Sequence, residues 1–366
     1  MQTPRFDLDK QGLLEQLKLS IEHTLCKFQS PGAAVAIYIN GQPFLGTGVG
    51  YQDIEGKIPL PTNANFYLYS ITKSLLAIAL LKLVDEGQLN LNMAIQSYLP
   101  HLPLDTPVTL QQLLSHTSGL PDYGGTSTYV NAVQSTPNTP WTAEAFLNLI
   151  QTQGLQFLPG RGWMYSNIGY LLLRCVLETI TNLSVQAVLE EHIFRPLSLQ
   201  NTFVPYTLSD VHGLTPGYST YFSNDELEDV TSFYHPGWVA HGVVVSTASD
   251  LAQVMDALFA GKLLSPLLLK QMLDPVYILG AHPLFVRLGY ALGLFVDVAS
   301  PYERVGGHTG EGPGYSTAAF HFSSLAGYRV TLVAFANTWV VRRSHNANMA
   351  ILNHRLLLDC LHPRSP

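Results

Sequence analysis

The fold of this 366-residue chain is decided by residues 66–80, whose sequence is FYLYSITKSLLAIAL, and by their continuation to Gly87. Apolar residues surround this segment on every side, which predicts a helix buried in the middle of the protein that ends at Gly87. Ser70 and Lys73 stand three residues apart in its first turn and therefore lie on one face of the helix. Burial disfavours the charged form of a lysine, so Lys73 is a candidate base for Ser70. This spacing also occurs by chance in many proteins, and the pair alone is weak evidence.

The composition indicates a globular protein with a large core. Hydrophobic residues make up 47% of the chain and charged residues only 12%. A length of 366 residues suits two domains, or one domain interrupted by another. The net charge of −7 and the scattered lysines and arginines argue against nucleic acid as a partner. A run of about 18 apolar residues is missing from the sequence, which argues against a membrane span.

Residues 1–10 contain neither an apolar stretch nor a cleavage site typical of a signal peptide. Taken as it stands, the sequence predicts a cytoplasmic protein, although a chain trimmed of its leader would look the same. The cysteines are Cys26, Cys175 and Cys360. Because they are far apart and odd in number, we expect reduced structural thiols.

The chain begins with a helix and a hairpin. Helical periodicity covers residues 8–28, and two apolar runs at 33–39 and 43–51 flank Asn40-Gly41, the dipeptide of a tight β-hairpin turn. From residue 89 to about 234 the patterns predict helices and long loops, without convincing strand pairs. The expected helices there are residues 109–115, capped by Thr109, and residues 141–151, 167–180 and 185–194.

The last third of the chain changes from a helical period to a period of two. Residues 246–250 cap a helix that runs to 258. Antiparallel strands are expected at 290–298, 302–305, 315–322 and 328–335, followed by a helix at 345–361. The sequence therefore predicts an α/β domain formed by residues 1–66 and 238–366. Its antiparallel sheet is flanked by N- and C-terminal helices, and a mostly helical domain, residues 67–237, is inserted into it.

Two further clusters strengthen the Ser70–Lys73 pair. Residues 159–170 place Tyr165 and Asn167 at the start of an apolar helix, and residues 306–315 place His308 and Thr309 at a glycine-rich strand edge. The ordered set Ser70-Ile71-Thr72-Lys73, Tyr165-Ser166-Asn167 and His308-Thr309-Gly310 resembles the serine β-lactamases of class C. It equally resembles the related D,D-peptidases, D-aminopeptidases and esterases of the penicillin-recognising group. Segments 113–121, 194–197 and 246–251 add to the resemblance, which covers roughly residues 30–340.

The resemblance implies an acyl-enzyme mechanism in a cleft between the two domains, without a metal or other cofactor. Ser70 would attack a carbonyl group, and Lys73 with Tyr165 would share its proton. The backbone N–H groups of Ser70 and Glu311 would form the oxyanion hole. Asn167 would hold Lys73 or the substrate, and it is also a candidate N-cap. The side of the cleft that meets the far end of the substrate would consist of His308, Thr309, Gly310 and Glu311.

Other catalytic interpretations lack their signatures. A Gly-x-Ser-x-Gly elbow is missing, none of the 13 histidines has a zinc-site spacing, and a phosphate-binding glycine loop is missing. His116 is expected to brace loops by hydrogen bonds, and the role of His241 stays equally open.

The third motif departs from that of many β-lactamases, which carry lysine where this chain has His308. A neutral histidine offers a hydrogen bond but not a permanent cation, and Glu311 would repel acidic groups. We therefore expect a small amide, peptide or ester as substrate, as for a D-amino-acid peptidase or esterase. The alternatives are a genuine β-lactamase or D,D-carboxypeptidase, and a non-catalytic binding or scaffold relative. The sequence leaves the oligomeric state open.

Overall fold

A nine-stranded antiparallel sheet organises the molecule in the computed structural model, which describes residues 10–102, 104–223, 226–280 and 285–340. The strand order is β3-β2-β1-β13-β12-β11-β10-β9-β8. Strands β1 (Gly32–Ile39) and β2 (Gln42–Asp53) form the predicted hairpin. Asn40 and Gly41 at its tip have φ angles of 51° and 83°, as such a tight turn requires.

The other strands of this sheet come mainly from the C-terminal third. They are β3 (Ile58–Pro59), β8 (Tyr277–Gly280), β9 (Leu288–Tyr290), β10 (Phe295–Asp297), β11 (Val305–Gly312), β12 (Tyr315–Leu325) and β13 (Tyr328–Ala336). Two small sheets accompany the large one. The first pairs β4 (Phe66–Tyr67) with β7 (Val245–Ser246), and the second joins β14 (Thr338–Trp339), β5 (Tyr218–Ser219) and β6 (Glu228–Asp229).

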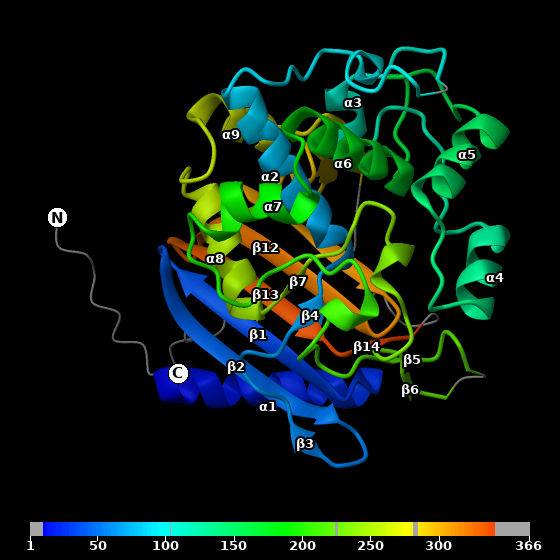
Figure 1. Ribbon diagram of the computed structural model, residues 1–366. Helices are drawn as coiled ribbons and strands as arrows, with labels where there is room; N and C mark the ends of the chain where they lie inside the picture. The colour runs from blue at the N-terminus through cyan, green and yellow to red at the C-terminus, as the bar shows by residue number, and fades with distance from the viewer. Residues whose placement is uncertain (1–9, 103, 224–225, 281–284, 341–366) are drawn as a thin grey trace.

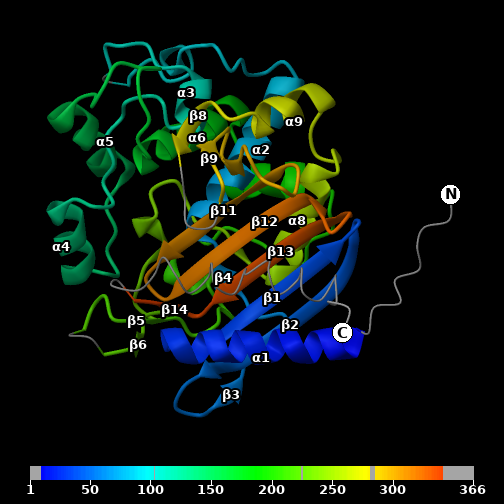
Figure 2. The same ribbon diagram turned by 180° about the vertical axis from the view of Figure 1, so that it is seen from behind.

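Both faces of the sheet are covered, which explains why strands such as β1 are mostly apolar and buried on both faces. Along β1, Val35 and Ile37 belong to the core under helix α1 (Lys10–Phe28), whereas Ala34 and Ala36 belong to the core on the opposite face. Helix α8 (Ala248–Phe259) packs on that opposite face. Figures 1 and 2 show α1 along one side of the sheet and the remaining helices on the other.

The helical part contains α2 to α7, and α9 follows α8. The bounds are α2 (Thr72–Asp85), α3 (Leu110–Leu114), α4 (Ser127–Ser135), α5 (Ala143–Gln153), α6 (Asn167–Thr181), α7 (Val185–Leu189) and α9 (Pro266–Leu273). Helix α2 is buried as predicted, and Figure 1 shows it running from the helical layer down to the sheet. Helices α4 and α9 were not expected, although Ser265 as N-cap with Pro266 at the first helical position is a recognisable helix start.

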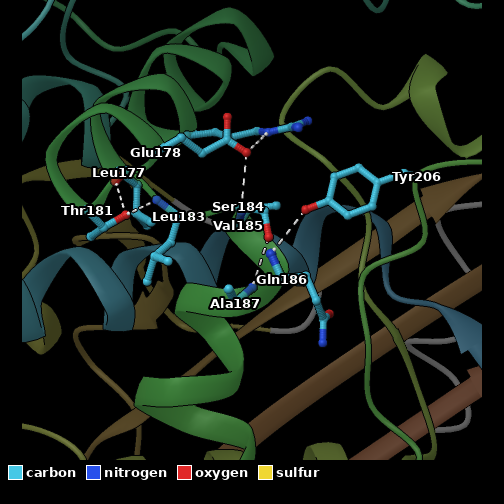
Figure 3. A network of polar contacts seen from close by, with 10 residues as sticks. Leu177, Glu178, Thr181, Leu183, Ser184, Val185, Gln186, Ala187 and Tyr206 are labelled. Atoms are coloured by element: carbon cyan, nitrogen blue, oxygen red, sulfur yellow. Dashed lines mark hydrogen bonds and ion pairs between the residues drawn. The ribbon is translucent and has the colours of Figure 1, made fainter.

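A polar network holds the corner between α6 and α7 (Figure 3). The Glu178 carboxylate accepts hydrogen bonds from Arg174 Nε at 3.1 Å and from the Val185 backbone N–H at 3.2 Å. Ser184 caps α7 by accepting from the Ala187 N–H. Within the described residues no single helix is long and apolar enough to cross a membrane. Helix α6 and residues 185–194 together have the length and apolar composition of a span, but they are bent by 79° relative to each other.

The strands near the predicted site differ from expectation. The segment 290–298 is not one strand: β9 ends at Tyr290, β10 begins at Phe295, and in the tight turn between them the Ala291 N–H donates to the Leu294 carbonyl. The expected strand at 302–305 is wrong, because β11 begins only at Val305. The His308 segment is therefore a full strand, paired with β10 and β12, and not a strand edge.

Some expectations cannot be compared with the structure. The predicted helix at 345–361 and Cys360 lie outside the described residues, whereas Cys26 and Cys175 are free thiols. One continuous apolar cluster includes sheet residues such as Val333 and helix residues such as Leu172. The division into residues 1–66 with 238–366 and residues 67–237 stays a prediction.

Truncation of the buried face of α2 should destabilise the protein. Leu76 is 0% exposed, whereas Leu19 on α1 is 66% exposed. We expect Leu76→Ala to lower the free energy of unfolding by about 3 kcal/mol, because it removes buried methyl groups and leaves a cavity. Leu19→Ala should change that free energy by no more than about 0.5 kcal/mol. Urea denaturation followed by circular dichroism measures both, and equal midpoints for the two variants would contradict the buried position of α2.

Candidate active site

Ser70 lies in a single 3-10 turn, Tyr69–Ile71, that leads directly into α2. The chain reaches this turn from β4, and the Leu68 N–H donates to the Val244 carbonyl at 2.8 Å. Tyr69 then adopts a left-handed conformation with φ of 46°, which is unfavourable for a residue with a side chain. Its hydroxyl group donates to the Pro313 carbonyl beyond β11. The backbone of Ser70 is thus fixed on both sides, while its side chain stays partly exposed.

Lys73 is fully buried and points at Ser70. Its Nζ lies 3.0 Å from Ser70 Oγ and 2.7 Å from Asn167 Oδ1. Burial lowers the pKa of Lys73 to about 7, and the negative charge of Asp122 partly opposes this shift. Ser70 and Lys73, a pair that was weak evidence in the sequence, are therefore in hydrogen-bond contact. With this pKa, neutral and charged forms of Lys73 are both populated near pH 7.

Asn167 is placed by the start of α6 and by Asp122. Ser166, and not Asn167, is the N-cap, since its Oγ accepts from the Gly169 N–H. Asp122 accepts from the Asn167 backbone N–H at 2.8 Å and from its Nδ2 at 3.3 Å. The amide nitrogen of Asn167 is occupied by this carboxylate, so its oxygen faces Lys73.

Tyr165 precedes this cap and contacts both members of the pair. Lys73 Nζ lies 4.8 Å from the centre of the Tyr165 ring, and Ser70 lies near enough to lower the pKa of Tyr165. Burial raises the pKa of Tyr165 well above its usual value, and the opposite effect of the nearby Ser70 is smaller. The tyrosine is therefore a neutral phenol at pH 7.

His116 braces the loops around Tyr165, as expected. Its Nδ1 accepts from the Ser166 N–H at 3.1 Å, and its ring lies 4.2 Å from that of Tyr165. Burial and the nearby Lys73 lower the pKa of His116 well below its usual value. The neutral ring supports the segment that carries Tyr165 and Asn167.

Strand β11 brings His308, Thr309, Gly310 and Glu311 to the site. A side chain at position 310 would place its Cβ 2.0 Å from the Leu68 carbonyl oxygen, so only glycine lets β11 approach the Ser70 turn this closely. Thr317 Oγ1 on the neighbouring strand β12 lies 3.1 Å from that same carbonyl oxygen. Thr309 and Glu311 are partly exposed beside the turn.

His308 is more deeply buried than a substrate contact requires, with 1% of its surface exposed. Its Nδ1 lies 2.6 Å from the Thr309 carbonyl oxygen and its Nε2 lies 3.1 Å from the Tyr290 hydroxyl group. Burial lowers the pKa of His308 to about 3, with a further contribution from Lys73. The ring is neutral and both nitrogens are engaged, so direct contact between His308 and a substrate stays a prediction.

Two site residues, Asp122 and Tyr290, carried no signal that the sequence analysis used, and the sequence left the role of His241 open. Asp122 orients Asn167, and Tyr290 meets His308. The Nε2 atom of His241 lies 3.4 Å from Lys73 Nζ. Asp122 could have been found from the sequence, because it directly follows the segment 113–121 that belongs to the resemblance. The position of His241 beside Lys73 depends on tertiary structure and has no such local signal. Among the described residues, no group of three His, Cys, Asp or Glu side chains comes together to hold a metal ion.

Comparisons with known proteins agree with this geometry. The family model described as "Beta-lactamase" matches residues 21–355. Penicillin-binding protein 4* of Bacillus subtilis (strain 168) is 29% identical over 350 residues, which cover 90% of this chain and 72% of that protein. Protein flp of Staphylococcus aureus (strain MW2) is 33% identical over 193 residues, 51% of this chain but only 38% of that protein.

A solved structure has the same fold over nearly the whole chain. The D-amino acid amidase from Ochrobactrum anthropi SV3, in complex with L-phenylalanine amide, superposes with a TM-score of 0.79 and 25% sequence identity. The superposition covers 97% of this chain and 100% of the amidase. The family match over most of the sequence, together with this fold, shows that the chain belongs to the beta-lactamase family and is an acyl-enzyme serine hydrolase acting on amides, peptides or esters.

Proposed function

We propose that Ser70 is the nucleophile and Lys73 its principal base. The observation that carries this proposal is the 3.0 Å contact between Lys73 Nζ and Ser70 Oγ, made by a lysine that is 0% exposed. The lowered pKa of Lys73, about 7, means that the free amine is well populated at neutral pH. The amine takes the Ser70 proton as Oγ attacks the carbonyl carbon, and it later returns a proton to the leaving group.

Tyr165 complements the lysine in this proposal. Because its pKa is raised, Tyr165 is a hydrogen-bond donor toward Ser70 Oγ and the leaving group, and Lys73 is the better base. The backbone N–H groups of Ser70 and Glu311 are the proposed oxyanion hole. The close approach of Gly310 to Leu68 supports this assignment, since it holds β11 beside the Ser70 turn.

We propose a neutral or amine-bearing amide, peptide or ester as substrate. Position 308 holds a neutral histidine and position 311 a carboxylate, so the described segment 308–311 does not supply the permanent cation that would attract a carboxylate-bearing antibiotic. Asn167 and Thr309 are the proposed polar contacts to the substrate. The likeness to a D-amino acid amidase supports an amide of a D-amino acid as the first compound to test.

The alternatives make different demands. A β-lactamase or D,D-carboxypeptidase would have to bind a substrate carboxylate near Glu311. A non-catalytic scaffold would not need a buried lysine bonded to Ser70, because burial of a charged amine costs several kcal/mol in desolvation. The cytoplasmic location stays a prediction, for which cell fractionation is the measurement.

A covalent probe should label Ser70. We expect a fluorophosphonate to add one adduct to the wild-type protein, seen by intact mass, and none to Ser70→Ala. Ser74→Ala, in the helix that follows the Ser70 turn, is the matched control, because Ser74 Oγ donates to the Gly293 carbonyl at 2.7 Å and has no role in the proposed chemistry. An adduct that persists in Ser70→Ala would contradict the assignment of the nucleophile.

The rate should follow the titration of Lys73. Since the base is the neutral amine, kcat/KM should rise with pH through a midpoint near 7, where the pKa of Lys73 is placed, and fall at lower pH as the amine is protonated. Lys73→Arg keeps the positive charge but cannot release its proton, and we expect kcat/KM to fall by about 100-fold or more at every pH, with loss of that midpoint. A wild-type profile that is flat between pH 5 and 9 would argue against Lys73 as the base.

Substrate choice should follow the charge at position 311. We expect a higher kcat/KM for a D-amino-acid amide and for a short acyl ester than for nitrocefin. Glu311→Gln should raise the value for nitrocefin relative to the ester by about fivefold, because it removes a repulsion of about 1 kcal/mol. A wild-type kcat/KM for nitrocefin above those of both other substrates would identify a β-lactamase instead.

A further inference from the structure

His241 is a buried side chain that the proposed chemistry does not yet use. It lies in the loop between the 3-10 turn Pro236–Trp238 and strand β7, and 1% of its surface is exposed. Its Nε2 atom lies 3.4 Å from Lys73 Nζ. It is therefore the third polar group around the lysine nitrogen, after Ser70 and Asn167.

The ring of His241 is neutral. Burial lowers its pKa well below the usual value, and the positive charges of Lys73 on α2 and Arg174 on α6 lower it further. His308 on β11 contributes in the same direction. Tyr170 on α6 presents its ring at 6.3 Å and adds no charge at neutral pH.

The surroundings also decide which nitrogen of the ring carries the proton. Nδ1 has no partner at normal hydrogen-bond geometry, but the backbone carbonyl of Tyr69 lies near enough to raise the pKa of His241. A proton on Nε2 would point at the N–H groups of Lys73, whose Nζ also donates to Asn167, whereas a proton on Nδ1 leaves Nε2 free to accept from the lysine. The Nδ1 tautomer is therefore favoured, and Nε2 presents its lone pair to the lysine.

We propose that His241 is a positioning residue that directs the lone pair of Lys73 toward Ser70. A neutral amine has two N–H donors and one lone pair. If Asn167 Oδ1 and His241 Nε2 each accept one N–H, the lone pair is left facing Ser70 Oγ, the atom whose proton must be removed. This inference rests on the proposed role of Lys73 as base.

The same arrangement suits the next step. As the bond between Ser70 Oγ and the carbonyl carbon forms, the O–H bond breaks and its proton moves to Lys73 Nζ. The resulting ammonium has three N–H donors, and Ser70, Asn167 and His241 are three acceptors at its nitrogen. Without His241, the second N–H of the free amine would have Ser70 Oγ as its nearest alternative, and the lone pair would then point away from the proton.

Two substitutions of His241 distinguish the effect of losing the hydrogen-bond acceptor from the effect of losing the volume of the ring. His241→Phe keeps a buried ring but removes the acceptor, whereas His241→Gln places an amide oxygen near the position of Nε2. His321→Phe is the control for inserting phenylalanine at a buried histidine, since His321 lies on β12 and bonds to Thr331. Thermal unfolding of all three variants checks that each is folded.

The first readout is the pH profile of kcat/KM with an acyl ester. We expect His241→Phe to lower the plateau by about 10- to 100-fold, because the base is misaligned. Its acidic limb should also move to lower pH, since loss of an acceptor destabilises the ammonium and lowers the pKa of Lys73. His241→Gln should recover most of the rate, and His321→Phe should leave the limb in place. An unchanged plateau and limb in His241→Phe would overturn the proposal.

The second readout does not need activity. In protein labelled with 13Cε-lysine, the resonance of Lys73, assigned by its loss in Lys73→Arg, should titrate near pH 7 in the wild type and at lower pH in His241→Phe. If the wild-type protein forms no Ser70 adduct but the titration still shifts, the proposed function fails while the contact of His241 with Lys73 stands. An identical midpoint in both proteins would refute the role of His241 whatever the activity.

Discussion

The burial of Lys73 against Ser70 is the constraint on which the rest of the structure depends. A lysine with 0% exposure loses the hydration of its charged form, at a cost of several kcal/mol for an uncompensated ion. Hydrogen-bond acceptors at Nζ offset part of this cost. The pKa of Lys73 is also lowered to about 7, so that the neutral amine, which is less costly to bury, is populated. Each acceptor comes from a different part of the chain. Formation of the site therefore requires α2, the start of α6 and the loop before β7 to pack together.

A second requirement is that the Ser70 turn be held against the sheet. Tyr69 keeps its left-handed backbone because its hydroxyl group reaches the Pro313 carbonyl and because β4 and β7 fix the chain ahead of it. Gly310 lets β11 lie against Leu68 with no intervening side chain. The helical part supplies the base and its supports, and the sheet supplies the wall that faces them. The position of Ser70 is the point at which both meet.

The sequence predicted those features that depend on local pattern or on ordered motifs. The buried helix after Ser70, the hairpin at Asn40-Gly41 and the family were confirmed. The strand expected at 302–305 was wrong, because the real strand β11 is the glycine-rich segment Val305–Gly312. Glycine has little β propensity, and the close approach that requires Gly310 is visible only in three dimensions. The contact between His241 and Lys73 joins residues 168 positions apart, and no local pattern encodes such a contact.

Three histidines near Lys73 have lowered pKa values, and this affects how the site handles charge. Burial keeps His116, His241 and His308 neutral, and a protonated Lys73 lowers their pKa values further. Before the reaction, the free amine of Lys73 adds no charge either. In the proposed mechanism, proton transfer from Ser70 then creates the ammonium at the same moment as the oxyanion forms on the substrate. Attraction between the two charges is absent in the ground state and present in the transition state, which is the condition for binding energy to increase the rate. A permanently charged histidine in this site would attract acidic substrates before the reaction, but it would also lower the pKa of Lys73 and weaken the base that the reaction needs.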